Sequence, residues 1–146
     1  MKKIMFVVPT LSSGGAERVV SIWSSELAKM GADIHLLVFY RVENEYLVND
    51  KVKIHAIKEN KEQYDKMSKL NKIKFLRSKL KRINPDIIIP FISHVGLMAN
   101  IARAGLKIKM IETIRIDPKY SPKNKVLRLL RNLSVLLSNG CIVQNK

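Results

Sequence analysis

Two adjacent glycines, Gly14 and Gly15, lie between an apolar segment and the start of an amphipathic one. The preceding run, Lys3–Val8, has the continuous apolar character of a strand that is buried on both faces. From Ala16, apolar residues recur at helical spacing as far as Gly31. A glycine pair at such a junction lets a ligand approach the main chain, and the unpaired N–H groups of a helix start attract phosphate oxygens. The pair therefore indicates contact with an anion or a sugar.

A structural interpretation of this loop stands beside the functional one. Gly14 and Gly15 can form a tight connection in which Ser12 or Ser13 caps the helix, and the spacing favours neither interpretation. The known nucleotide patterns do not decide the question, because the chain contains neither G-x-G-x-x-G nor G-x-x-x-x-G-K-[ST]. Glu17 is expected to complement the dipole of the helix start rather than to contact a substrate.

A histidine follows a later apolar run. His94 comes after residues 86–91, which read as a strand. Ligands of open α/β sheets bind outside the carboxyl ends of the parallel strands, so we expect His94 at the same edge as the glycine pair. There it can donate a hydrogen bond to a sugar hydroxyl or to a phosphate. The alternative is a surface histidine, or one that caps the following helix.

A second group of polar residues ends the apolar run at 108–114. Glu112 and Arg115 are expected to approach the same edge of the sheet. The planar guanidinium of Arg115 is suited to hold a phosphate. The alternative for Arg115 is an ion pair with Glu112 or Asp117.

The elements that position these residues alternate along the chain. We expect strands at 3–8, 33–40, 51–57, 86–91, 108–114 and from 141, helices at 16–31, 70–83, 95–104 and 123–138, and a surface loop or frayed helix start at 58–69. Strands separated by helices predict βαβ units and a parallel sheet. The expected fold class is a doubly wound, Rossmann-like α/β sheet flanked by helices, in a single domain over residues 1–146.

Composition limits the class of protein. The chain has 146 residues, of which 47% are apolar, so it is long enough and apolar enough to form a core. No apolar run approaches the roughly 18 residues of a membrane-spanning helix. The start imitates a signal peptide, but its apolar patch, residues 4–8, is too short. The single cysteine, Cys141, fits a reducing compartment, and we expect a cytoplasmic protein, peripheral at the inner face of the membrane.

The net charge of +15 is confined to the second half of the chain. Residues 1–65 carry nine basic and nine acidic residues, whereas residues 66–146 carry eighteen basic and three acidic ones. Such a field implies an anionic partner: lipid head groups, nucleic acid or a phosphate-bearing substrate. The basic segments hold no spaced row of aromatic residues for base stacking, so nucleic acid is the less favoured partner.

The expected helix at 123–138 combines positive charge with a wide apolar arc. Its cations are Lys123, Lys125, Arg128 and Arg131. Its apolar residues are Val126, Leu127, Leu129, Leu130, Leu133, Leu136 and Leu137. Part of this arc is expected to cover the sheet. The remainder, with the flanking cations, is expected to face an anionic bilayer.

Four segments together resemble a known enzyme family. They are "PTLSSGGAERVV", "LAKMGADIHLLVF", "INPDIIIPFISH" and the closing "CIVQNK". They are similar to segments of the retaining glycosyltransferases of the GT-B fold, in the large fourth family. The resemblance covers essentially the whole chain, and it implies the N-terminal, acceptor-side half of a GT-B architecture, without the C-terminal nucleotide-sugar domain.

The resemblance also implies roles for the residues named above. Gly14 and Gly15 would lie against the donor's diphosphate and the reacting sugar, and His94 would be the catalytic polar residue. Glu112 and Arg115 would line the acceptor pocket. The nucleotide sugar is then a donor substrate and no cofactor is implied. Scattered histidines and a single cysteine predict no metal site.

The function implied is transfer of a sugar from a nucleotide-diphosphate donor to a lipid-linked glycan, with retention of configuration. The chain alone is expected to be inactive and to need a second domain, either as a truncated product or as half of a split enzyme. A non-catalytic peripheral membrane or scaffold module is the alternative. A basic nucleic-acid binder is a less favoured one.

Overall fold

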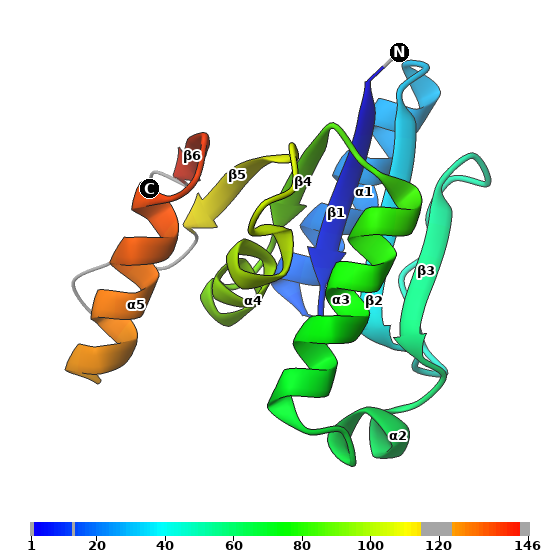
Figure 1. Ribbon diagram of the computed structural model, residues 1–146. Coiled ribbons are helices and arrows are strands. Elements are labelled where there is room, and N and C mark those ends of the chain that lie inside the picture. The colour runs from blue at the N-terminus through cyan, green and yellow to red at the C-terminus, as the bar shows by residue number, and fades with distance from the viewer. Residues whose placement is uncertain (1, 13, 115–123, 144–146) are drawn as a thin grey trace.

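The computed structural model describes residues 2–12, 14–114 and 124–143, which form a six-stranded sheet with helices on both faces (Figure 1). The strands are β1 (Lys3–Val8), β2 (Asp33–Tyr40), β3 (Lys53–Lys58), β4 (Ile87–Pro90), β5 (Lys109–Ile114) and β6 (Gly140–Val143). The helices are α1 (Gly15–Lys29), α2 (Lys61–Asp65), α3 (Lys69–Ile83), α4 (Ser93–Arg103) and α5 (Lys125–Leu136). Their alternation confirms the predicted α/β class.

The strand order is β3-β2-β1-β4-β5-β6, and every neighbouring pair is parallel. The order reverses between β1 and β4, because the chain first builds outward from β1 to β3 and then returns to the other side of β1. This reversal is the topological switch point at which doubly wound sheets open a crevice.

Two differences from the predicted helices and strands change the description of the chain. A short helix, α2, lies where a surface loop or frayed helix start was predicted, because Asn60 caps it by accepting a hydrogen bond from the N–H of Gln63. Helix α4 begins at Ser93 rather than at Val95, so His94 lies in the first helical turn and not in a loop.

The central strand β1 separates two apolar cores. Met5 and Val7 face one core, Phe6 and Val8 face the other, and all four are fully buried. This alternation is the reason why residues 4–8 are all apolar: both faces of the strand are covered.

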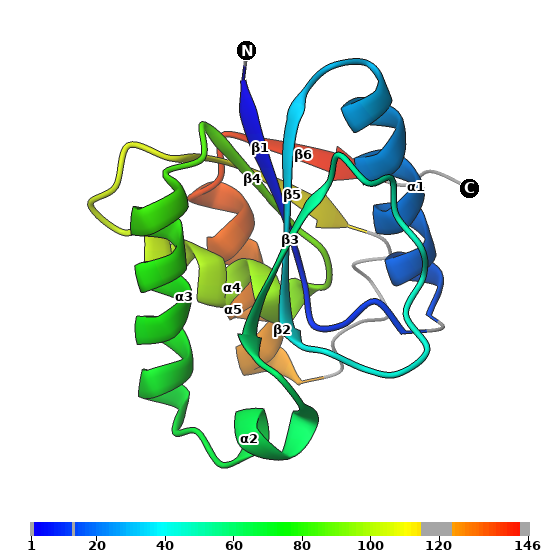
Figure 2. The same cartoon turned by 90° about the vertical axis from the view of Figure 1, so that its right-hand side faces the viewer.

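The two cores are covered unequally. Helices α3, α4 and α5 lie on one face of the sheet, whereas α1 lies on the other (Figure 2). Helix α1 ends where Gly31 adopts a φ of 94°, and α3 ends at Asn84 with a φ of 47°. Glycine and asparagine are the residues that tolerate this left-handed conformation, so they stop each helix and turn the chain back toward the sheet.

The core predicts a large difference between two leucines of α3. Leu80 is fully buried, whereas Leu70 on the same helix is 61% exposed. We expect Leu80→Ala to lower the free energy of unfolding by about 2–5 kcal/mol, because it removes buried contacts and leaves a cavity. Leu70→Ala should change it by less than about 0.5 kcal/mol. Urea denaturation of both variants measures the difference, and equal losses would contradict the position of α3.

Candidate active site

The glycine loop leaves the carboxyl end of β1 and is anchored on both sides. Leu11 is fully buried in the core beneath α1, and its carbonyl accepts a hydrogen bond from the N–H of Tyr46 at 2.8 Å. Thr10 and Ser12 join their hydroxyls at 2.8 Å, and the carbonyl of Ser12 accepts from the N–H of Gly14 at 2.8 Å. The described residues on both sides of Ser13 are therefore anchored by hydrogen bonds and burial.

The two glycines differ in what surrounds them. Gly15 is exposed, and a Cβ added to it would meet no atom within 4 Å. A Cβ on Gly14 would lie 2.0 Å from Oε2 of Glu17, so that carboxylate rests directly on the glycine. Gly14 has a φ of −84°, which any residue can adopt, so the sequence requires glycine there for room and not for backbone freedom.

Glu17 therefore lies at the start of α1, as its predicted interaction with the helix dipole requires. It occupies the third helical position, where a carboxylate faces the unpaired N–H groups. Gly14 occupies the N-cap position of α1 and has no side chain to cap the helix. The described hydroxyl of Ser12 instead pairs with that of Thr10, whereas Ser13 lies outside the described residues, so its capping role stays a prediction. The open approach to the main chain is on the side of Gly15.

The start of α4 faces the same edge of the sheet from the neighbouring strand. Val7 of β1 pairs with Pro90 of β4, and the N–H of Phe91 continues this ladder by donating to the carbonyl of Val7 at 2.8 Å. Because α1 and α4 cover opposite faces, their first turns diverge from two adjacent strands. His94 and the glycine pair thus lie on the two sides of the switch point.

The turn into α4 contains an unusual residue, which sequence reasoning missed. Ile92 has φ 78° and ψ 133°, a conformation that a β-branched side chain rarely adopts. Such strain costs of order 1–3 kcal/mol and persists only where surrounding contacts enforce it. Here the side chain of Ile92 packs against the core, and its carbonyl accepts from the N–H of Val95 at 3.0 Å.

His94 is exposed at this turn, although neighbouring atoms remove part of the water around its ring. This partial desolvation lowers the pKa of His94 below its ordinary value of 6.5. The imidazole is therefore neutral at pH 7, with one nitrogen that donates a hydrogen bond and one that accepts.

Glu112 lies inside the protein rather than at an open acceptor site. It is 1% exposed, and its Oε2 accepts a hydrogen bond from the hydroxyl of Ser134 at 3.1 Å. A Cβ on Gly96 would lie 2.0 Å from Oε1 of Glu112, so the carboxyl packs directly against α4. Burial raises the pKa of Glu112 to about 7, which the Ser134 hydrogen bond partly offsets. This position corrects the predicted acceptor contact, because no solute can reach the carboxyl in this arrangement.

The remaining predicted residues have mixed outcomes. Arg115 and Lys123 lie outside the described residues. Lys125 and Arg128 are exposed on α5, as a surface-binding role requires. Arg131 is only 8% exposed and is not membrane-facing, because it turns inward and donates to Oδ1 of Asn132 at 2.8 Å.

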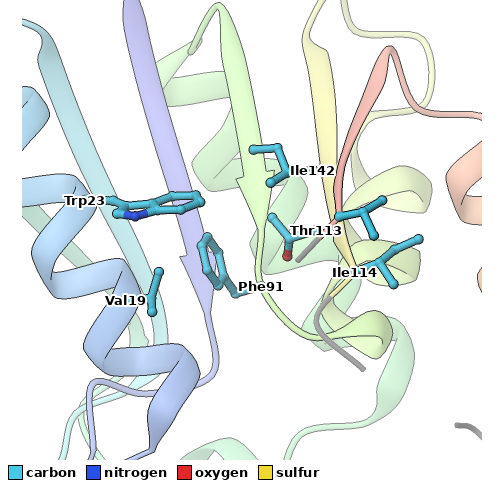
Figure 3. Close-up of a pocket in the computed structure, with 7 residues that line it drawn as sticks. Val19, Trp23, Phe91, Thr113, Ile114 and Ile142 are labelled. Atoms are coloured by element: carbon cyan, nitrogen blue, oxygen red, sulfur yellow. The ribbon is translucent and has the colours of Figure 1, made fainter. Parts of the chain in front are cut away.

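An apolar hollow of about 290 Å³ lies beside this edge, on the face that carries α1 (Figure 3). Its walls are Val19, Trp23, Phe91, Thr113, Ile114, Ile142 and Val143. The rings of Trp23 and Phe91 meet edge-on, with 5.8 Å between their centroids. Trp23 is 37% exposed because no helix covers β5 and β6 on this face in the described structure.

The family described as Glycosyl transferase 4-like matches residues 8–139, nearly the whole chain. The chain belongs to that glycosyltransferase family. It is therefore a glycosyltransferase N-terminal domain, as the glycine segment predicted.

One curated relative and two solved structures place the domain further. It is 31% identical over 137 residues to the GalNAc-alpha-(1->4)-GalNAc-alpha-(1->3)-diNAcBac-PP-undecaprenol alpha-1,4-N-acetyl-D-galactosaminyltransferase of Campylobacter jejuni. That match covers 92% of the domain and 38% of the relative, so the chain spans well under half of the relative's length.

The two solved structures show the fold. MurG of Acinetobacter baumannii shares 12% identity and a TM-score of 0.61 over 100% of this domain and 42% of MurG. The UDP-GlcNAc 2-epimerase of Methanocaldococcus jannaschii shares 14% identity and a TM-score of 0.59 over 99% of this domain and 40% of the epimerase. Since a domain of the glycosyltransferase family and an epimerase share this sheet, the fold alone does not select the reaction.

The contact between Glu17 and Gly14 is testable by a double-mutant cycle. Gly14→Ala should destabilise the domain, because the new Cβ displaces the Glu17 carboxylate from the helix start. In the Glu17→Ala background the same change should cost less, with a coupling of about 0.5–1 kcal/mol by thermal or urea denaturation. Gly15→Ala is the matched control, since its Cβ meets open space. Additive losses would show that the carboxylate does not rest on Gly14.

Proposed function

We propose that this domain forms the acceptor side of an enzyme that transfers a sugar, with retention of configuration, from a nucleotide-diphosphate donor to a lipid-linked glycan. The open face of Gly15, at the switch point between β1 and β4, carries the proposal. Support for the acceptor comes from the Campylobacter jejuni relative, whose name specifies an undecaprenol-linked glycan. That relative is much longer than this chain, so the reaction of the whole enzyme is part of the proposal.

The proposed mechanism rests on positioning. The exposed main chain at Gly15 and the N-terminal dipole of α1 would face the diphosphate and the reacting sugar as negative charge develops on the leaving group. His94, neutral at pH 7, would donate a hydrogen bond to a sugar hydroxyl or to the phosphate from the other side of the crevice. Arg115 would hold a phosphate of the acceptor through its guanidinium fork.

We propose that a second domain supplies the nucleotide pocket of the enzyme, and that the domain described here has no turnover without it. The two would form one crevice, with the donor bound chiefly by the second domain and the acceptor chiefly by this one.

A second property, docking to an anionic membrane surface, is favoured by α5. Its exposed residues form an apolar stripe: Val126, Leu129, Leu133, Leu136 and Leu137. Lys125 and Arg128 flank this stripe and are also exposed. An apolar face bordered by cations is the pattern of a helix that lies in the interface of an anionic bilayer. No helix among the described residues has the length and apolar character needed to cross a bilayer.

The cations of α3 add to this surface. Lys74, Arg77, Lys81 and Arg82 line a shallow depression on the exposed side of that helix. Arg77 has a structural task as well, because its Nη1 donates to the carbonyls of Ala102 and Ala104 at the end of α4. Helices α3 and α5 lie on the same face of the sheet, on the two sides of α4, so both contribute positive charge to that face (Figure 2).

The catalytic part of the proposal predicts the effect of a bulky residue at the glycine loop. In the complete enzyme, Gly15→Val should lower kcat/KM about tenfold or more relative to the enzyme with the original glycine. The reason is that the valine side chain blocks the approach to the main chain. The fold should tolerate the change, since a Cβ at Gly15 meets no atom within 4 Å. The assay follows nucleotide release with a panel of nucleotide sugars, and circular dichroism checks the fold. A folded variant with unchanged turnover would argue against the role of Gly15.

The membrane part predicts the behaviour of leucine variants in vesicle sedimentation. Leu133→Ser with Leu136→Ser should lower the fraction of protein bound to vesicles of anionic phospholipid about tenfold, because two apolar anchors are lost. Leu47→Ser is the matched control, since Leu47 is 94% exposed but lies far from α5 in the chain. Equal binding of all three proteins, or preference for RNA over anionic vesicles, would contradict docking through α5.

A further inference from the structure

Among the described side chains of α5, the two that are buried are polar, which is unusual for a helix that packs on a sheet. Ser134 is fully buried and Arg131 is 8% exposed, whereas the leucines at 129, 133 and 136 face solvent. A helix normally turns its apolar stripe inward. Hydrogen bonds must therefore contribute to the attachment of α5, in addition to apolar contact.

These hydrogen bonds form a directed chain from α4 to β5. The guanidinium of Arg103 donates from Nε to Oδ1 of Asn100 at 2.9 Å. Asn100 donates from Nδ2 to Oγ of Ser134 at 2.8 Å, and that hydroxyl donates to Oε2 of Glu112 at 3.1 Å. Arg103 also donates to the carbonyl of Leu137, just beyond the end of α5. The chain thus ends on a carboxyl that contacts α4, α5 and β5 at once.

Few groups around Glu112 can stabilise a negative charge. From α4 it meets Gly96, which has no side chain, and Arg103 reaches it only through Asn100 and Ser134. From β6 the thiol of Cys141 lies opposite it in the register. From α5, Arg131 lies one turn before Ser134 and binds Asn132. The ion pairs between described residues include none with Glu112.

We propose that Glu112 is a proton-controlled clamp on α5, which holds the helix when the carboxyl is protonated and loosens it when the carboxyl ionises. An ionised carboxylate that is 1% exposed and has one hydroxyl donor is poorly solvated, and separating α5 from the sheet would admit water to it. Because α5 carries the exposed leucine stripe, proton uptake at Glu112 would also set how firmly that stripe is presented. This last consequence, and no other part of the inference, rests on the proposed membrane docking.

The sign of the effect on stability follows from linkage. Burial raises the pKa of Glu112 from 4.5 to about 7, so the folded state binds the proton more tightly than the unfolded state. The free energy of unfolding therefore falls as the pH rises from about 4.5 through 7, and the effect levels off above that.

The matched variant is Glu112→Gln, which keeps the size of the side chain and removes its titration. At about pH 8, hydrogen exchange of the α5 amides should be about tenfold slower in this variant than in the original chain, within the roughly 300-fold limit that the pKa change sets. At about pH 5 the two proteins should exchange alike. Glu26→Gln is the control, because that carboxylate is 59% exposed and pairs with Lys29 on the surface.

Two results would overturn the clamp. One is a difference between the original chain and Glu112→Gln that does not change with pH. The other is a carboxyl titration of Glu112, followed by carbon NMR in the original chain, with its midpoint near 4.5. The titration also decides the matter if Glu112→Gln does not fold. Neither measurement involves sugar transfer or vesicles, so failure of the clamp and failure of the proposed function are distinguishable.

Discussion

The parallel pairing of β1 with β2 on one side and β4 on the other is the constraint on which the rest of the structure depends. Both faces of β1 are buried, and the helix that follows it and the helix that follows β4 cover opposite faces of the sheet. Their first turns then diverge at one edge. The placement of Gly15 on one side of this edge and of His94 on the other is a consequence of this topology.

At that edge, the local sequence determines the room around the main chain and the charge at the two helix starts. Glycine at position 14 makes room for the carboxylate of Glu17, which lies in the first turn of α1, where negative charge is favourable. Glycine at position 15 leaves the main chain open. On the opposite side, the strained backbone of Ile92 begins α4 immediately after a buried strand residue and brings His94 into the first turn. Adjacent strands therefore present two different surfaces, one of bare backbone and one with a neutral imidazole.

Helix α5 shows how tertiary contacts can override an amphipathic pattern. Its sequence has enough leucine to cover the sheet, yet the buried positions among its described side chains hold Ser134 and Arg131. The hydrogen-bond chain through Asn100 to Glu112 accounts for this choice, since a buried serine is tolerated where it both donates and accepts. The same orientation leaves the leucines outside. A polar attachment and an apolar outer face thus arise together, which links the buried carboxyl to the surface that we propose to dock on membranes.

The sequence by itself determined the order and type of the main elements, because a strand buried on two faces and a helix buried on one leave periods that can be read in one dimension. The sequence also determined the position of the glycine loop and the family to which the chain belongs. Only the tertiary structure decided the places of Glu112, Arg131 and Trp23, since burial depends on which face of the sheet a neighbouring helix covers. Glu112 ends a predicted strand as an open-site residue would, yet α4 and α5 close over it. Trp23 lies on the same helix as the buried Val20 and Ala28, yet the described structure has no helix opposite to bury it.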